Sequence, residues 1–118
     1  MKFFLITALI LLTTQLAQAE INQLFIKNCA ACHSVQKGDK ALRAGPNLWG
    51  VVGRKAATQS DYTMYSAALK KSGITWNEEI LDKWLTNAGA LVPGTNMYYM
   101  QADASVRKTI IGYLKTLK

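Results

Sequence analysis

The sequence predicts an all-α domain with three to five helices, and two observations support this fold class. Apolar residues recur at helical spacing in three segments, around residues 21–25, 80–85 and 106–117. No segment alternates apolar and polar residues over the length of a convincing strand. The 118 residues are enough for one domain and not for two.

The first amphipathic helix is predicted from Ile21, Leu24 and Phe25, whose spacing indicates about three turns that lead directly into Cys29. Helical spacing is then lost over residues 34–48, which are rich in lysine, glycine and other turn-forming residues. We expect an exposed basic loop here, which ends in a turn at Gly45-Pro46-Asn47-Leu48 with the φ angle of the proline fixed.

Two further helices are indicated in the middle of the chain. Residues 66–71 predict a short helix that Gly73 terminates. Asn77 is a suitable N-cap for the next helix, and two glutamates follow it in the first turn, where they favour the helix dipole. Its apolar residues keep helical spacing to about Asn87.

The C-terminal part is predicted to contain one long helix. Residues 88–92 are expected to form a neutral, apolar connection, and Pro93-Gly94-Thr95-Asn96 is a loop signal. Asp103 then caps the last helix. The apolar stripe of this helix consists of Val106, Ile110, Tyr113, Leu114 and Leu117.

Residues 1–19 have the features of a secretory signal peptide. Lys2 is the positive start, residues 3–12 are apolar, and Ala17-Gln18-Ala19 is a cleavage signature. The apolar run is shorter than the roughly 20 residues that span a bilayer. We therefore expect cleavage after Ala19, a mature domain of residues 20–118 and a periplasmic location; the alternative is an uncleaved membrane anchor.

The stretch Cys29-Ala30-Ala31-Cys32-His33 has the spacing of a c-type haem attachment motif. Two thiols at this spacing lie about one helical turn apart, so they can reach two neighbouring vinyl groups on one porphyrin edge. His33 follows directly and can offer a neutral imidazole nitrogen to the iron. The chain has no other cysteine or histidine.

Three other interpretations of this motif fit the sequence less well. A thioredoxin-type redox pair needs no histidine and belongs in a βαβ pattern, which this sequence lacks. A zinc site needs four ligands, and there is no second Cys/His pair. A disulfide between Cys29 and Cys32 would close a very short loop and stabilise little. We therefore predict one covalently bound haem c.

The charge of the chain restricts its partners. The formal net charge is +7, and removal of Lys2 with the signal leaves one positive charge fewer; two haem propionates would lower it further. The sequence has no Lys/Arg-rich run or nucleic-acid-binding motif, so we expect no nucleic-acid partner. The basic balance fits attraction to an acidic protein partner, although it also serves solubility.

Iron bound by His33 would have a second axial face, and because there is no other histidine, a protein ligand there would be a methionine, a lysine or a tyrosine. Met97 is preferred, because the preceding Pro93-Gly94 suits a loop that places one side chain across a cofactor. Met100 is the main competitor, and Met64 is a weaker one. A thioether ligand raises the reduction potential, and two filled axial sites leave no site for oxygen or peroxide, as an electron carrier requires.

Five segments together resemble class I cytochrome c, in its mitochondrial and bacterial c2-like branch. Their order and spacing agree with that family over nearly all of the mature chain. The segments are CAACHS (29–34), GPNLWGVVGRK (45–55), YS (65–66), GITW (73–76) and PGTNM (93–97).

The resemblance implies the small cytochrome c fold, wrapped around one haem. Cys29 and Cys32 would bear the haem, and His33 and Met97 would be its axial ligands. The carbonyl of Pro46 would accept a hydrogen bond from the other ring nitrogen of His33. The remaining positions that would pack against the haem or its propionates are Arg54, Tyr65, Trp76 and Thr95. Phe25 and Tyr113 would form the aromatic contact between the first and last helices.

The chain departs from the family pattern at three places. Ile21 stands where the family has glycine at the helix crossing, so either Gly112 supplies a close approach or the crossing is looser. Trp84 stands where the family has a tyrosine near the methionine. The stretch before Met97 lacks the lysines of mitochondrial relatives, which predicts a flatter, more apolar docking face and weaker salt dependence of partner binding.

Taken together, these features predict a soluble, monomeric one-electron carrier and not an enzyme. The resemblance implies a quinol-oxidising cytochrome complex as donor and an oxidase, peroxidase or reductase as acceptor, and transient contact with a membrane surface is compatible with this role. The alternative is a ligand sensor or small peroxidase with an open axial site, for which no second histidine is present. A domain of a larger oxidase subunit is disfavoured.

Overall fold

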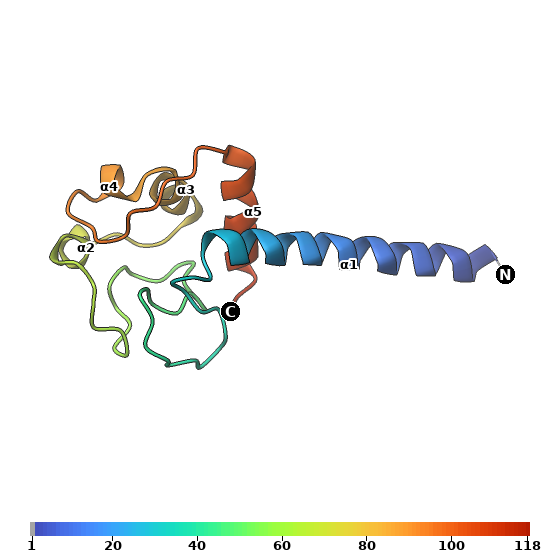
Figure 1. The fold of residues 1–118 in the computed structure, drawn as a ribbon, viewed down its shortest axis with the longest axis horizontal. Coiled ribbons are helices and arrows are strands. Elements are labelled where there is room, and N and C mark those ends of the chain that lie inside the picture. Colours follow the sequence, from blue (N-terminus) through green and yellow to red (C-terminus); the bar gives the residue numbers. More distant parts are fainter. Residues whose placement is uncertain (1) are drawn as a thin grey trace.

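The computed structural model describes residues 2–118, with side chains from residue 6 onward. Within this range the chain forms five helices and no strand, which confirms the all-α class. Figure 1 shows the first part of α1 projecting from a compact body built from the other helices and the long loops between them. The helices are α1 (Lys2–Asn28), α2 (Ala67–Ser72), α3 (Glu78–Thr86), α4 (Ala88–Leu91) and α5 (Ala104–Lys115).

The helix expected from Ile21 onward is the last part of a longer one. α1 runs without interruption from Lys2 and ends at Asn28, directly before the cysteine motif. The N–H of Cys29 still donates to the carbonyl of Phe25 at 2.8 Å, so the helical hydrogen bonding reaches the first cysteine. None of the described helices combines the length and the apolar character that crossing a membrane would require.

The end of α1 packs against α5 through an aromatic pair, as predicted. The rings of Phe25 and Tyr113 meet edge to face, with their centroids 5.5 Å apart. A methyl group added at Gly112 would meet no atom within 4 Å, so this glycine does not mediate a close approach of the two helices. Aromatic packing therefore forms the crossing, which is of the looser of the two expected kinds.

The glycine stop predicted for α2 and the N-cap predicted for α3 are present. Gly73 ends α2 with a φ angle of +65°, and Ser66, expected as the first residue of this helix, is instead its N-cap, because its hydroxyl accepts a hydrogen bond from the N–H of Leu69 at 3.1 Å. At the start of α3, the side-chain oxygen of Asn77 accepts from the N–H of Ile80 at 2.8 Å. These local polar contacts place both helix boundaries close to their predicted positions.

The connection predicted over residues 88–92 is instead the short helix α4, so that prediction was wrong. The side-chain oxygen of Asn87 accepts from the N–H of Ala90 at 3.1 Å, and this cap starts a new turn immediately after α3. Four residues, three of them alanine or glycine, give too little apolar periodicity to predict a helix. α5 begins as expected, with the carboxylate of Asp103 accepting from the N–H of Ser105 at 2.8 Å.

Long loops occupy the half of the body opposite α3 and α5. Residues 29–66 contain no helix. An isolated antiparallel bridge between Lys55 and Thr75 connects this loop region to the segment that leads into α3. The loops and the helices enclose an apolar interior between them. This interior opens to the surface as the cavity described next.

Candidate haem site

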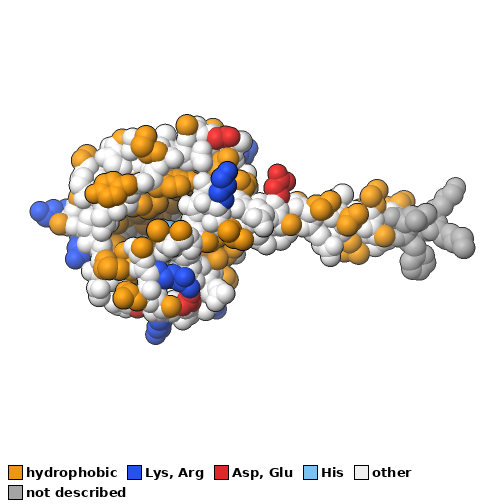
Figure 2. All heavy atoms as spheres, in the orientation of Figure 1, with side chains coloured by type: hydrophobic (Ala, Val, Ile, Leu, Met, Phe, Trp, Pro, Cys, Tyr) orange, Lys and Arg blue, Asp and Glu red, His pale blue; other side chains and the backbone are white. Residues whose placement is uncertain are grey.

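An apolar cavity of about 440 Å³ opens on one face of the body. This volume lies within the range of cofactor and small-molecule sites. Figure 2 shows the hollow, with mostly hydrophobic side chains in and around it. The lining residues on which the site depends are Cys29, Cys32, His33, Gly45, Pro46, Arg54, Tyr65, Leu69, Trp76, Trp84, Leu85, Thr95, Met97 and Tyr99.

One side of the cavity, here called the cysteine wall, consists of residues 29–33 together with Gly45 and Pro46. The carbonyl of Cys29 accepts from the N–H of Cys32 at 3.1 Å and from that of His33 at 3.0 Å, which winds the motif into a tight turn. The carbonyl of Cys32 accepts from the N–H of Gly45 at 2.9 Å. Backbone contacts therefore bring the two parts of this wall together.

The imidazole of His33 is fixed in one orientation by Pro46. Its Nδ1 lies 2.7 Å from the carbonyl oxygen of Pro46. A carbonyl oxygen can only accept, so Nδ1 carries the hydrogen and Nε2 keeps a free lone pair. Burial lowers the pKa of His33, which favours the neutral form that binds a metal.

Gly45 is required by the position of the His33 ring. A Cβ atom at residue 45 would lie 2.3 Å from Cε1 of His33 and within 2.8 Å of both ring nitrogens. Only a glycine allows the ring to lie this close to the backbone. The dipeptide Gly45-Pro46 thus seats the ring with its first residue and orients it with its second.

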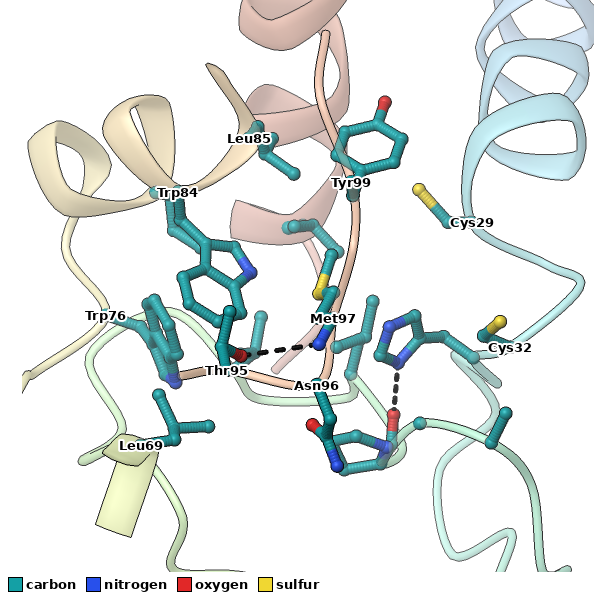
Figure 3. Close-up of a pocket in the computed structure, with 18 of the residues that line it drawn as sticks. Cys29, Cys32, Leu69, Trp76, Trp84, Leu85, Thr95, Asn96, Met97 and Tyr99 are labelled. Carbon is teal, nitrogen blue, oxygen red and sulfur yellow. Dashed lines mark hydrogen bonds between the residues drawn. The ribbon is translucent and has the colours of Figure 1, made fainter. Parts of the chain in front are cut away.

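The two thiols are free and accessible to different degrees. Cys29 is partly buried and Cys32 is exposed. Burial, with a smaller contribution from Cys32, raises the pKa of the Cys29 thiol to about 11, so this thiol is protonated at neutral pH. Figure 3 shows both cysteines on one side of the cavity, with Leu69, Trp76 and Trp84 on the other and Met97 between them.

The second side, here called the methionine wall, consists of residues 92–101 and contains no helix beyond its junction with α4. The N–H of Thr95 donates to the carbonyl of Val92 at 3.1 Å, and Gly94 adopts a φ angle of +93° within this turn. The hydroxyl of Thr95 accepts from the N–H of Met97 at 3.3 Å, a contact drawn in Figure 3. The turn thereby directs Met97 toward the cavity.

The three candidate methionines differ in position. Met97 is partly buried and lines the cavity, whereas Met64 and Met100 do not line it. Met100 is 71% exposed and Met64 is 42% exposed. The side chain of Asn96 donates to the carbonyl of Met64 at 2.9 Å, which ties the methionine wall to the loop before α2.

The four residues expected at the propionates all line the cavity. Arg54 donates to the carbonyls of Trp49 at 3.1 Å and Asn47 at 3.2 Å, and burial lowers the pKa of its guanidinium. None of the ion pairs found in the described residues includes Arg54. A half-buried guanidinium with unused donors is suited to an acidic group of a ligand.

Tyr65, Trp76 and Thr95 are more constrained by the protein itself. Trp76 is 7% exposed, and its ring contacts Trp84 edge to face with centroids 5.0 Å apart. Tyr65 packs in the same manner on Tyr62, at 4.6 Å. Thr95 is only 4% exposed and, as described above, already serves the methionine turn.

Trp84 lies deep in the cavity on the side of Met97. It is 6% exposed, and Figure 3 shows the nitrogen-bearing edge of its indole directed toward the centre of the pocket and Met97. An indole N–H can donate but cannot accept. A tryptophan here can therefore offer a hydrogen bond only to a lone pair.

The residues present fit a haem attached through the cysteine motif. The cavity is apolar, two free thiols stand at one edge, and a neutral imidazole with a free nitrogen faces it from the same wall. Met97 is the soft donor available on the other wall, and Arg54 is a donor for an acidic group. One imidazole and one thioether, with two thiols at the edge, suit an iron porphyrin rather than a bare metal ion. The described residues contain no cluster of acidic, histidine or cysteine side chains that could hold a metal ion by itself.

Sequence reasoning missed several residues that shape the site. The need for glycine at residue 45 is not evident from the sequence, although this residue belongs to the predicted turn 45–48. Tyr62 and Tyr99 also line the cavity, and no sequence motif singles them out. Burial raises the pKa of Tyr99, so its phenol is a neutral donor at pH 7. The hydroxyl of Tyr99 donates to the side-chain oxygen of Asn28. The two residues are distant in sequence, and no local pattern could have identified this contact.

The chain is similar to known proteins in both sequence and structure. Residues 18–118 match the family model named Cytochrome c. The chain is 43% identical over 100 residues to cytochrome c2 of Rhodopila globiformis, which covers 84% of this chain and 92% of the relative. It is 43% identical over 97 residues to cytochrome c of Euglena viridis, with 81% and 92% covered. Among solved structures, cytochrome cH from Methylobacterium extorquens superposes with a TM-score of 0.71 at 41% identity, over 83% of this chain and 96% of that one.

Proposed function

Because the chain belongs to the cytochrome c family, carries one covalently bound haem c and is an electron carrier rather than an enzyme, we propose that His33 and Met97 bind its iron on the two axial faces. Cys29 and Cys32 form the thioethers. Arg54, Tyr65, Trp76 and Thr95 pack around the haem or contact its propionates. The protein then shuttles single electrons between respiratory partners.

One observation supports the axial ligands above the others. His33 and Met97 line the same cavity from different walls, while the other two mature methionines lie outside it. The hydrogen bond from His33 to Pro46 leaves Nε2 of the ring available. A chain with both axial positions filled from within has no open site at which a substrate could react.

The surrounding residues would each have a definite task. When bound, the haem supplies an iron that changes its charge by one electron. Pro46 holds the His33 ring in one tautomer and orientation, so the imidazole need not reorganise. The thioether of Met97 is a soft, neutral donor that favours the reduced state. The buried rings of Trp76 and Trp84 keep water away, which limits the polar rearrangement that a change of charge would otherwise cause.

The test is the optical spectrum of the oxidised holoprotein. A methionine sulfur bound to ferric iron gives a weak far-red charge-transfer band, which we expect in the wild type and not in Met97→Ala. Met100→Ala is the matched control and is expected to keep the band. If the band is lost in Met100→Ala but kept in Met97→Ala, Met100 is the ligand instead. If the wild type has no band and binds cyanide rapidly, the axial site is open and the sensor or peroxidase alternative is favoured.

We also propose that the protein is exported and cleaved after Ala19, so that residues 20–118 function in the periplasm. The apolar run and the cleavage signature support this, as does a family match that begins at residue 18. Intact mass of protein purified from the periplasm is expected to correspond to residues 20–118 plus one haem. Recovery of the full-length chain from the membrane fraction would support the anchor instead.

The partners are proposed from the family. A quinol-oxidising cytochrome complex would reduce the haem, and an oxidase, peroxidase or reductase would oxidise it. Residues 87–102, which include the methionine wall, contain no charged side chain, and Tyr98 within them is 93% exposed. This composition favours a docking surface of apolar and aromatic character.

A further inference from the structure

A side-chain contact joins the methionine wall to the end of α1. The hydroxyl of Tyr99 donates to the side-chain oxygen of Asn28 at 2.9 Å, across 71 positions of sequence. The side chain of Gln101 donates to the same oxygen at 3.3 Å. Asn28 in turn donates through its amide nitrogen to the carbonyl of Leu24 at 2.9 Å. The amide of Asn28 is therefore bonded on both sides, within its own helix and across the cavity edge.

Both ends of this contact are firmly held. On the methionine wall, the carbonyl of Tyr99 accepts from the N–H of Ala88 at 3.2 Å, and the N–H of Gln101 donates to the carbonyl of Leu85 at 2.9 Å. Arg107 adds a bond to the carbonyl of Gln101 at 2.9 Å. The Tyr99–Asn28 bond thus connects two anchored segments rather than two loose side chains.

The position of Tyr99 is distinctive among the aromatic residues of this wall. Figure 3 shows its ring between Leu85 and Cys29 at the edge of the cavity. Its neighbour Tyr98 is 93% exposed and does not share this environment. The chain therefore offers two adjacent tyrosines, of which only Tyr99 bridges the two walls.

We propose that the Tyr99–Asn28 hydrogen bond is a latch that keeps the methionine wall closed against the end of α1, next to Cys29. The closed wall limits the entry of external ligands to the iron. This inference rests on the proposed ligation by Met97. Met97 lies two residues before Tyr99 on the same non-helical stretch. When the latch opens, the side-chain bonds of Asn96 to Met64 and of Gln101 to Asn28 remain, as does the backbone bond of Tyr99 to Ala88, but the Tyr99 side chain no longer holds the Met97 segment against α1. Tyr99 is on this view a positioning residue, which acts on Met97 through the backbone between them.

The expected size of the effect follows from the bond removed. A part-buried hydrogen bond between neutral side chains changes an equilibrium by about three- to tenfold. Loss of the latch should therefore increase the population of the open wall, and the rate of ligand entry, by about the same factor.

The experiment measures imidazole binding to the ferric holoprotein by stopped-flow absorbance. At saturating imidazole, a chain with Met97 on the iron reacts at a limiting rate set by opening of the wall. Tyr99→Phe is expected to raise this limiting rate about three- to tenfold. Tyr98→Phe, the matched loss of one hydroxyl, is expected to leave it unchanged. Equal rates in Tyr99→Phe and the wild type would overturn the latch.

Variants of Asn28 separate a latch from general destabilisation. Asn28→Leu removes the acceptor of both Tyr99 and Gln101, so it should accelerate binding at least as much as Tyr99→Phe does, and the double variant should be no faster than Asn28→Leu alone. Asn28→Asp keeps an acceptor for Tyr99 and should bind imidazole at close to the wild-type rate. Additive effects in the double variant would contradict the latch.

Failure of the underlying ligation would give a different result. If Met97 is not a ligand, the wild-type rate would rise linearly with imidazole without a limit, and Met97→Ala would bind no faster than the wild type. A limiting wild-type rate that Met97→Ala abolishes, together with an unaffected Tyr99→Phe, would retain the ligation and reject the latch alone.

Discussion

The two walls of the cavity reach similar precision by different means. The cysteine wall is built from a helix end, a tight turn and a backbone contact between Cys32 and Gly45, all closed by main-chain hydrogen bonds. The methionine wall follows a four-residue helix. Backbone bonds of Tyr99 and Gln101 tie its far end to Ala88 and Leu85, but the stretch around Met97 is fastened by side chains, Asn96 on one side and Tyr99 on the other. The first wall is thus set by local structure, and the second depends on contacts that reach far along the chain.

This difference suggests how the site divides its tasks. A wall fastened by the backbone opens only when the surrounding structure unfolds. A wall fastened by individual side chains can open locally at lower free energy. His33 should therefore be the permanent ligand and Met97 the exchangeable one.

Removal of the haem should have the largest effect on stability, because both walls lose the group that they enclose. An empty cavity of about 440 Å³ would cost on the order of 10 kcal/mol if it stayed open as a void, comparable with the whole stability of a small domain. Protein expressed without haem attachment should show no cooperative thermal transition by circular dichroism. Hydrogen exchange should find its residual protection where Phe25 packs on Tyr113. A sharp melting transition in the haem-free chain would contradict this.

Among the residues of the cysteine wall that do not themselves hold the haem, Gly45 should be the most sensitive to substitution, and Gly45→Ala should be strongly destabilising. The new Cβ would lie 2.3 Å from the His33 ring, and the bond from the N–H of residue 45 to Cys32 prevents the backbone from retreating. Overpacking of this kind costs about 1–3 kcal/mol or more in the free energy of unfolding, which guanidinium titration of the holoprotein would measure. Gly112→Ala is the matched control, since its Cβ meets no atom within 4 Å, and it should stabilise α5 by about 0.5–1 kcal/mol. Equal effects of the two substitutions would remove the steric role of Gly45.

The same contrast explains what the sequence could predict. The helix caps at Asn77 and Asp103 rely on neighbours two or three residues away, so composition and spacing are enough to locate them. The cysteine motif is also contiguous, and the fold class and haem followed from these local signals. The helix α4 was missed because its residues have no apolar pattern.

The contacts that fasten the methionine wall could not be predicted in the same way. The partner of Tyr99 lies 71 residues away and that of Asn96 lies 32 away. Nothing in either local sequence specifies the pairing, because it exists only once the walls face each other. Met97 could be singled out from its loop, but what holds it there could not.

Asn96→Ala should loosen the methionine wall. Its cost in free energy should be smaller than that of Gly45→Ala in the cysteine wall. The lost bond to the carbonyl of Met64 is exposed and should cost about 1 kcal/mol or less. We expect the far-red band to disappear at a lower temperature while helical circular dichroism melts almost as in the wild type. Asn22→Ala, a substitution on an exposed part of α1, serves as the control. A parallel fall of both transitions would mean that the wall does not open independently of the fold.

The smallest effect should be that of salt on partner binding, and it tests the outer face of the methionine wall. Residues 87–102 are uncharged, so long-range attraction to a partner should contribute little there. Oxidation of the reduced protein by membranes containing a terminal oxidase should slow only slightly as ionic strength rises. Ala90→Lys places a charge on an exposed residue of this neutral stretch, and it should make the rate more dependent on salt because added ions screen the new attraction. A steep decline already in the wild type would show that lysines outside this stretch direct docking, and the apolar wall would then serve closure of the site rather than recognition.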